Sequence, residues 1–158
     1  MRVSFTTTAL MAAVTVFVLG TPARLQAGEE EGSLRAAAVT LARQYDDNYN
    51  AKNASGMVAL YANDGALVTS GPVIQGHDKL QQYYQSRFDA GATNHHMIVK
   101  AVQAQGDGGF GIGEVQVTAP FGPDAKVTPL HGNVVWVYER EAEGWKYRAV
   151  VGNLAPAK

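Results

Sequence analysis

The sequence predicts an α+β fold, in which three helices come first and a run of antiparallel strands follows. Apolar residues recur at spacings of three and four over residues 33–52 and again over residues 77–90, as they do along one face of a helix. From residue 95 onward, long runs rich in alternating apolar residues are separated by glycine turns, which is typical of antiparallel hairpins. Three helices over one strongly curved, mostly antiparallel sheet would form a cone-shaped α+β barrel whose open mouth is a pocket.

The expected elements follow one another without an internal repeat. The first helix spans residues 33–52 and carries Tyr45 and Tyr49 on its apolar face. A short second helix is expected around Met57, and a third spans residues 77–90. Asn63-Asp64-Gly65 predicts a turn before the first strand. The expected strands are residues 66–69, 73–75, 95–103, 110–118, 127–140 and 145–153.

The first 27 residues predict a secretory signal peptide. Arg2 gives a positive start, residues 9–19 form an apolar run, and small residues suited to cleavage follow, best after Ala27 and second best after Ala23. The apolar run is too short for a membrane span, and the alternative is an uncleaved N-terminal anchor. We therefore expect an exported protein, periplasmic or secreted.

The rest of the chain is expected to be a short disordered linker, residues 28–32, and one domain, residues 33–154. A content of 46% hydrophobic and 17% charged residues indicates a globular chain. Removing residues 1–27 takes away Arg2 and Arg24, which leaves 11 basic and 14 acidic residues and a net charge of −3. A mildly acidic chain without a basic cluster is not expected to bind nucleic acid, and no membrane partner is expected. The chain has no cysteine, which excludes disulfides and thiol chemistry.

One long segment resembles the nuclear transport factor 2-like superfamily, in its SnoaL-like and ketosteroid isomerase-like branches. The segment reads YDDNYNAKNASGMVALYANDGALVTSGPVIQGHDKLQQYY, and the closing EGWKYRAV strand adds to the resemblance. The resemblance implies a cone of helices against a strongly bent sheet, often dimeric through that sheet. Members include isomerases, cyclases, dehydratases and binding domains, so the fold says little about function.

The chemistry of ketosteroid isomerases does not carry over to this chain. The resemblance aligns the family's helical tyrosine with Tyr45, which matches. It aligns the catalytic base, an aspartate in the family, with Thr69, and a threonine hydroxyl cannot take a proton from carbon near neutral pH. The aspartic acid that stabilises the enolate aligns near Asn133 or Val134, where no carboxyl group exists. Ketosteroid isomerase activity is therefore not expected.

His95 and His96 are the most reactive-looking pair in the chain. Adjacent strand residues face opposite sides of a sheet, and His95 shares its side with Met97 and Val99. His95 is thus expected to point into the pocket, where a histidine can act as a general base. His131 could join it if the strand register allowed. Two histidines on opposite faces cannot chelate one metal, so no metal site and no cofactor are expected.

The other pocket candidates are mostly aromatic. Tyr45 and Tyr49 could donate hydrogen bonds to a ligand, and Thr69 takes the place of the isomerase base. Tyr84 on the third helix and Trp136 on the long strand could line the pocket, although a core position is the alternative for each. Asp64 more often caps its own turn than catalyses. The glycine-rich GDGGFGIG lies between strands and is not a phosphate loop.

These observations leave three hypotheses for function. The first is an exported protein whose pocket binds a small, largely apolar or amphipathic molecule. The second is an enzyme of the isomerase, dehydratase or cyclase kind that uses a pocket histidine as base with Tyr45 as polariser. The third is an interaction module that forms a homodimer through the sheet.

Overall fold

A computed structural model describes residues 23–157 of the chain. It confirms the α+β class, with three helices packed on a six-stranded mixed sheet. The helices are α1 (Ala23–Asn50), α2 (Ala54–Val58) and α3 (His77–Asp89). The strands are β1 (Tyr61–Val68), β2 (Ile74–Gln75), β3 (Thr93–Gln105), β4 (Gly108–Phe121), β5 (Lys126–Glu141) and β6 (Gly144–Pro156).

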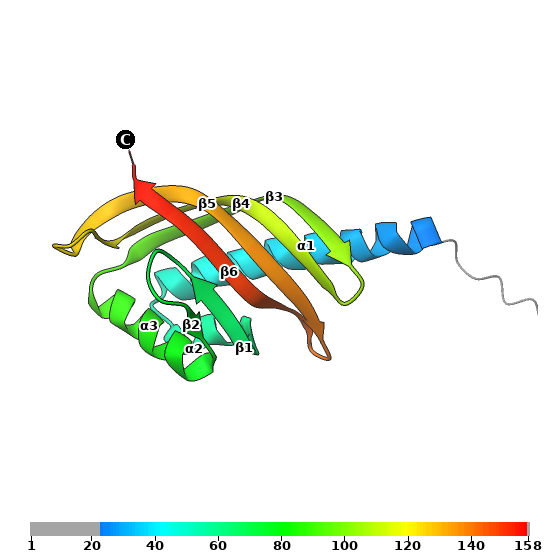
Figure 1. Cartoon of the computed structure of the whole chain (residues 1–158), viewed down its shortest axis with the longest axis horizontal. Helices are drawn as coiled ribbons and strands as arrows, with labels where there is room; N and C mark the ends of the chain where they lie inside the picture. Colours follow the sequence, from blue (N-terminus) through cyan, green and yellow to red (C-terminus); the bar gives the residue numbers. More distant parts are fainter. Residues whose placement is uncertain (1–22, 158) are drawn as a thin grey trace, which may run out of the picture.

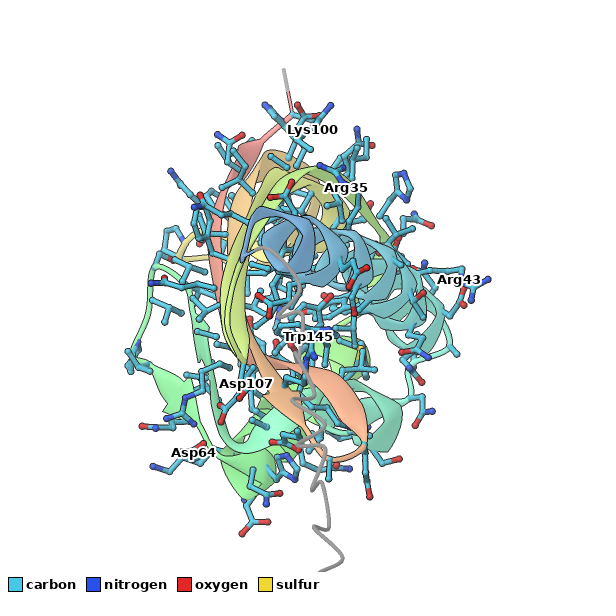
Figure 2. The ribbon with its side chains drawn as sticks, turned by 90° about the vertical axis from the view of Figure 1, so that its right-hand side faces the viewer. Arg35, Arg43, Asp64, Lys100, Asp107 and Trp145 are labelled. Atoms are coloured by element: carbon cyan, nitrogen blue, oxygen red, sulfur yellow. The ribbon has the colours of Figure 1, made fainter. Side chains whose placement is uncertain are left out.

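The sheet is open and has the order β2-β1-β6-β5-β4-β3. Every neighbouring pair is antiparallel except β1 and β6, which run parallel. The four long strands β3–β6 curve over α1, while α2 and α3 lie near β1 and β2 at one end of the sheet (Figure 1). The view from the side shows α1 against the concave face, with Arg43 pointing away from the sheet (Figure 2).

The first helix is longer than expected. Residues 28–32, expected to be a disordered linker, are helical, and α1 begins at Ala23 instead of Ser33. Glutamate favours helices, and the three consecutive glutamates at 29–31 need no tertiary partner on a helix that extends past the sheet (Figure 1). Residues 1–22, most of the expected signal peptide, lie outside the described residues. Among the described residues, no helix has the length and apolar character needed to cross a membrane.

The first strand also begins earlier than expected, at Tyr61, and the turn expected at residues 63–65 lies inside it. Tyr61 pairs with Tyr147 and Ala66 with Ala149, so β1 uses three more residues than β6 over the same stretch. Asn-Asp-Gly thus forms an irregularity within the strand, as bulges do. The remaining boundaries differ from the expected ones by a few residues.

The core lies between α1 and the concave face of the sheet. Trp136 and Tyr138 on β5 are almost fully buried there. Their rings lie over Gly111 and Gly113 of β4, where a methyl group at Gly113 would come within 2.6 Å of the Trp136 ring and also collide with the Ile98 carbonyl oxygen. Gly111 and Gly113, the last two glycines of GDGGFGIG, thus make room for two large aromatic rings.

Candidate functional site

Helix α1 presents four neighbouring side chains toward the sheet and the start of β3. Tyr45 and Tyr49 are one turn apart, and their rings stack with centroids 6.2 Å apart. Both are buried, with 4% and 5% of their surface exposed. Asp46 and Asn50 follow them by one residue each and therefore lie on the flank of the helix that meets β3.

Asp46 and Asn50 hold the first residues of β3 against α1. The Asn50 amide donates to the His95 carbonyl oxygen at 2.9 Å and accepts from the His95 backbone N–H at 2.8 Å. The Asp46 carboxylate accepts from the Met97 backbone N–H at 3.1 Å. Three side-chain-to-backbone bonds thus fix the position of His95.

Two imidazoles share the Asp46 carboxylate. His95 Nδ1 lies 2.7 Å from Oδ1, and His96 Nδ1 lies 3.1 Å from Oδ2. A carboxylate only accepts, so Nδ1 of His95 must carry the hydrogen, which leaves Nε2 as the unprotonated nitrogen of the neutral ring. Burial lowers the pKa of His95 from its ordinary value, and Asp46 opposes that shift. His95 is therefore neutral at pH 7, with Nε2 able to accept a proton.

Both tyrosine rings contact the His95 ring. The ring centroid of Tyr45 is 4.8 Å from that of His95, and the centroid of Tyr49 is 4.6 Å away. The Tyr45 hydroxyl, however, points to a buried chain of hydroxyls, 2.7 Å from Tyr84, which is in turn 2.7 Å from Tyr61. Burial raises the pKa of Tyr45 and Tyr84 well above the ordinary value. These hydroxyls stay protonated, and that of Tyr45 is already engaged.

A cavity of about 60 Å³ lies beside His95, between α1, α3 and the sheet. Tyr45, Tyr49 and His95 form one wall. Most of the rest is aliphatic and comes from five strands, through Leu67, Met97, Val115, Val117, Val134 and Val150. A space of this size holds about two water molecules, so the cavity alone is too small for a drug-sized ligand.

The cavity continues into an outer recess of about 320 Å³. The residues shared by the two spaces mark the mouth: Thr69, Tyr83, Arg87, Gly152 and Leu154. Tyr83 and Arg87 are one turn apart on α3 and thus stand side by side. The recess reaches the lower end of the volume range of ligand pockets, about 300–1,000 Å³.

Several further hollows in the described part of the chain lie outside this cavity. One, of about 560 Å³, borders the other side of the Asp46 carboxylate and includes His96. Another, of about 520 Å³, lies between Asn94 and Ala157 and includes none of the six predicted pocket residues. His131 lines the latter.

The structure brings together four of the six predicted pocket residues. Tyr45, Tyr49, Thr69 and His95 line the cavity. Tyr84 does not line the cavity, and its hydroxyl forms a hydrogen bond with that of Tyr45.

Trp136 is fully buried in the core over Gly113 and does not line the cavity. His95 faces inward as expected, whereas the His96 side chain is 61% exposed. His131 on β5 pairs with Gln116 of β4, which in turn pairs with His96 of β3. His131 therefore lies on the same face of the sheet as His96, opposite to His95, and does not join His95. In the described part of the chain, no three His, Cys, Asp or Glu side chains are grouped to hold a metal ion.

Sequence reasoning missed Asp46, Asn50, Tyr83 and Arg87. Asp46 and Asn50 lie outside the apolar stripe of α1. Hydrophobic periodicity identifies only the residues of that stripe. Their spacing of four residues does place them on one flank, but only the register of β3 against α1 identifies His95 as their partner. Arg87 follows Tyr83 by the same spacing on α3.

Comparison with known proteins identifies the family. A family model described as SnoaL-like domain matches residues 30–151, and the chain therefore belongs to the SnoaL-like domain family. No curated protein sequence matches this chain.

Several solved structures share the fold. A ketosteroid isomerase-like protein from Erwinia carotovora atroseptica SCRI1043 is 24% identical, with a TM-score of 0.65 over 82% of this chain and 98% of that one. An NTF2-like protein with a cystatin-like fold from Novosphingobium aromaticivorans is 17% identical, with a TM-score of 0.62 over 86% and 88%. A protein of unknown function with a cystatin-like fold from Nostoc punctiforme is 15% identical, with a TM-score of 0.65 over 78% and 92%. At these identities the similarity establishes the fold alone.

Proposed function

We propose that this chain binds a small, largely apolar molecule in the cavity between α1, α3 and the sheet. The observation that carries the proposal is an aliphatic cavity with a fixed, neutral histidine in its wall. Such a site combines apolar walls with one placed polar group, as small-molecule sites generally do. The ligand would occupy the cavity and the adjoining recess together.

Native mass spectrometry of the purified chain tests this proposal. We expect a retained mass above that of the bare chain, or such a mass after incubation with an extract of small molecules. Val134→Phe should abolish that mass because the new ring fills the cavity, whereas Val135→Phe, on the outer face of the same strand, should leave it unchanged. Retention that is equal in both variants would contradict binding in this cavity.

The Asp46–His95 pair favours a second candidate, an acid–base enzyme of the isomerase, dehydratase or cyclase kind. His95 Nε2 would take a proton from the bound molecule, and Asp46, 2.7 Å from Nδ1, would stabilise the resulting imidazolium. Tyr45 contributes its ring to this arrangement, since its hydroxyl is bonded to Tyr84. Tyr49, which also lines the cavity, would then be the tyrosine that polarises a ligand.

Deuterium exchange distinguishes the enzyme hypothesis from the hypothesis of binding alone. If the retained molecule is incubated with the chain in D₂O, the enzyme hypothesis expects deuterium at a carbon position of that molecule. His95→Gln should stop the exchange while leaving retention intact. Retention by the wild type without exchange would support binding alone.

We also propose a homodimer formed through the outer face of the sheet. Ile112, Val135 and Val151 lie directly beside one another on β4, β5 and β6. Each is 38–47% exposed, and Phe110 and Val137 extend the patch. Contiguous exposed apolar patches of this kind often mark interaction sites.

Export remains a proposal that rests on the sequence of residues 1–27. Expression of the full chain in a Gram-negative host should give a periplasmic product whose N-terminus begins at Gly28. A chain lacking residues 1–27 should stay in the cytoplasm. An uncleaved full-length product in the membrane fraction would favour the anchor instead.

A further inference from the structure

We propose that the ligand of this cavity is an amphipathic carboxylic acid whose carboxylate binds Arg87 at the mouth. This inference rests on the proposed binding function and names the chemical class of the ligand. It follows from the position of Arg87, from the charges around it and from the contrast between the mouth and the inner walls.

Arg87 is held at the mouth by contacts on both sides. From α3, its Nη1 donates to the Pro120 carbonyl oxygen at the end of β4, at 3.0 Å. Its positive charge also acts on the Tyr49 hydroxyl. Burial raises the pKa of Tyr49 to about 12, and the charge of Arg87 acts in the opposite direction. The guanidinium therefore lies between the inner cavity and the outer recess, both of which it lines.

The positive charge of Arg87 is not neutralised by a neighbour. Within residues 23–157, no aspartate or glutamate lines the cavity or the recess, and none of the ion pairs found there includes Arg87. Asp89 on the same helix accepts a hydrogen bond from Gln85. A half-buried cation without a carboxylate partner is suited to bind an anion from solution.

The geometry of the guanidinium favours a carboxylate. Arginine has five N–H donors in a planar fork, and two of them can bind both oxygens of one carboxylate. The mouth also offers the hydroxyl groups of Thr69 and Tyr83, and the recess offers that of Ser70. One side of the site thus presents a charge and several donors, whereas the inner walls are aliphatic.

This contrast fixes the orientation of the ligand. Its carboxylate lies at the mouth on Arg87, the end of its hydrocarbon part points inward past Tyr83 toward Met97 and Val134, and the rest of the hydrocarbon lies in the recess. Burial of that hydrocarbon part supplies the apolar contribution to affinity. Amines and other cations are disfavoured by the like charge of Arg87.

The Arg87–Pro120 bond also ties α3 to β4, so Arg87 has a structural role as well. Loss of that role would change stability or weaken the binding of every ligand to a similar degree. It would not change the ratio of affinities for a carboxylate and an uncharged molecule of the same shape. That ratio is therefore the quantity to measure.

Calorimetric titration of the purified chain with octanoate and octanamide, and with 3-phenylpropanoate and its amide, tests the inference. We expect each wild-type acid to bind roughly tenfold or more tightly than its amide, as a charge-assisted bond to arginine implies. Arg87→Met should bring the ratio close to one, and Arg87→Lys should restore part of it. Lys79→Met removes one positive charge from the exposed side of the same helix and should leave the ratio unchanged.

Each result has one meaning. If both molecules of each pair bind the wild type equally, or if Arg87→Met leaves the ratio unchanged, the inference is wrong while binding in the cavity stands. If neither acids nor amides bind at millimolar concentration, the proposed binding function is wrong and the inference falls with it. The wild-type ratio provides the test even if Arg87→Met does not fold.

Discussion

One carboxylate, that of Asp46, accepts hydrogen bonds from two imidazoles and one backbone N–H. Its side chain is only 15% exposed. At the scale of single residues, Asp46 therefore decides both the orientation of His95 and the start of β3. Its effect on His95 is to offset part of the shift that burial causes.

Replacement of Asp46 by asparagine should lower the pKa of His95 further. The amide oxygen can still accept from Nδ1, but the negative charge that favoured the imidazolium is gone, so burial acts unopposed. We also expect a loss of about 1–3 kcal/mol in the free energy of unfolding. NMR titration of the His95 ring measures the first effect and urea unfolding the second. Asp47→Asn, at the exposed neighbouring position, is the control, and an unchanged His95 pKa in D46N would contradict the assignment.

His95 should also make the stability of the fold depend on pH. Its pKa in the folded state is lower than its ordinary value of 6.5, so below about pH 6.5 the unfolded chain binds a proton that the folded chain does not. Stability is therefore lost as the pH falls from about 6.5 to the folded-state pKa, and no further loss from His95 occurs below it.

Urea unfolding of the wild type and His95→Gln between about pH 7.5 and about pH 5 checks this dependence. The other titrating groups are common to both proteins, so the difference between the two curves isolates His95. The wild type should lose more stability on acidification than H95Q. Parallel curves would show that His95 titrates alike in the folded and unfolded chains.

At the scale of elements, the packing of the β5 aromatic rings against strand β4 depends on the glycines of β4. Gly113→Ala should cost about 1–3 kcal/mol of stability, since a methyl group there meets the Trp136 ring at 2.6 Å and the backbone of β3. Gly152→Ala on β6 is the matched control, because a methyl group there meets nothing within 4 Å. Thermal unfolding measures both, and equal melting temperatures would contradict this account of the glycines.

The helices and long strands could be predicted because their apolar periods are long and regular. The start of β1 could not, since Asn63-Asp64-Gly65 has the composition of a turn, and only pairing with β6 shows it to be an irregular stretch of strand. Asp64 forms an ion pair with Arg148 of β6, a contact with no local signal. Local composition therefore predicted the elements better than it predicted their ends.

At the scale of the whole molecule, the site combines residues from α1, α3 and several strands. The inward side of His95 followed from strand alternation, which is a local rule. The partnership of Asp46 with His95 and the position of Arg87 at the mouth depend on how α1 and α3 lie on the sheet. No periodicity contains that information, which is why Trp136 was wrongly placed in the pocket.

The proposed homodimer predicts a concentration-dependent mass. The wild type should sediment at twice the chain mass, and Val135→Lys, at the centre of the outer apolar patch, should sediment as a monomer with an unchanged circular dichroism spectrum. Lys79→Glu, at an exposed position on α3 and outside the sheet, is a charge-changing control. A monomeric wild type at micromolar concentration would contradict the dimer.

The parallel pairing of β1 with β6 joins the first strand of the domain to the last. During synthesis, β1, β2 and α3 leave the ribosome before the strand that completes their sheet, since Gly144–Pro156 follows all the other described strands in sequence. Contacts of such large sequence separation slow folding. The N-terminal half of the domain therefore cannot complete its sheet by itself, and the native state can form only after β6 has been made.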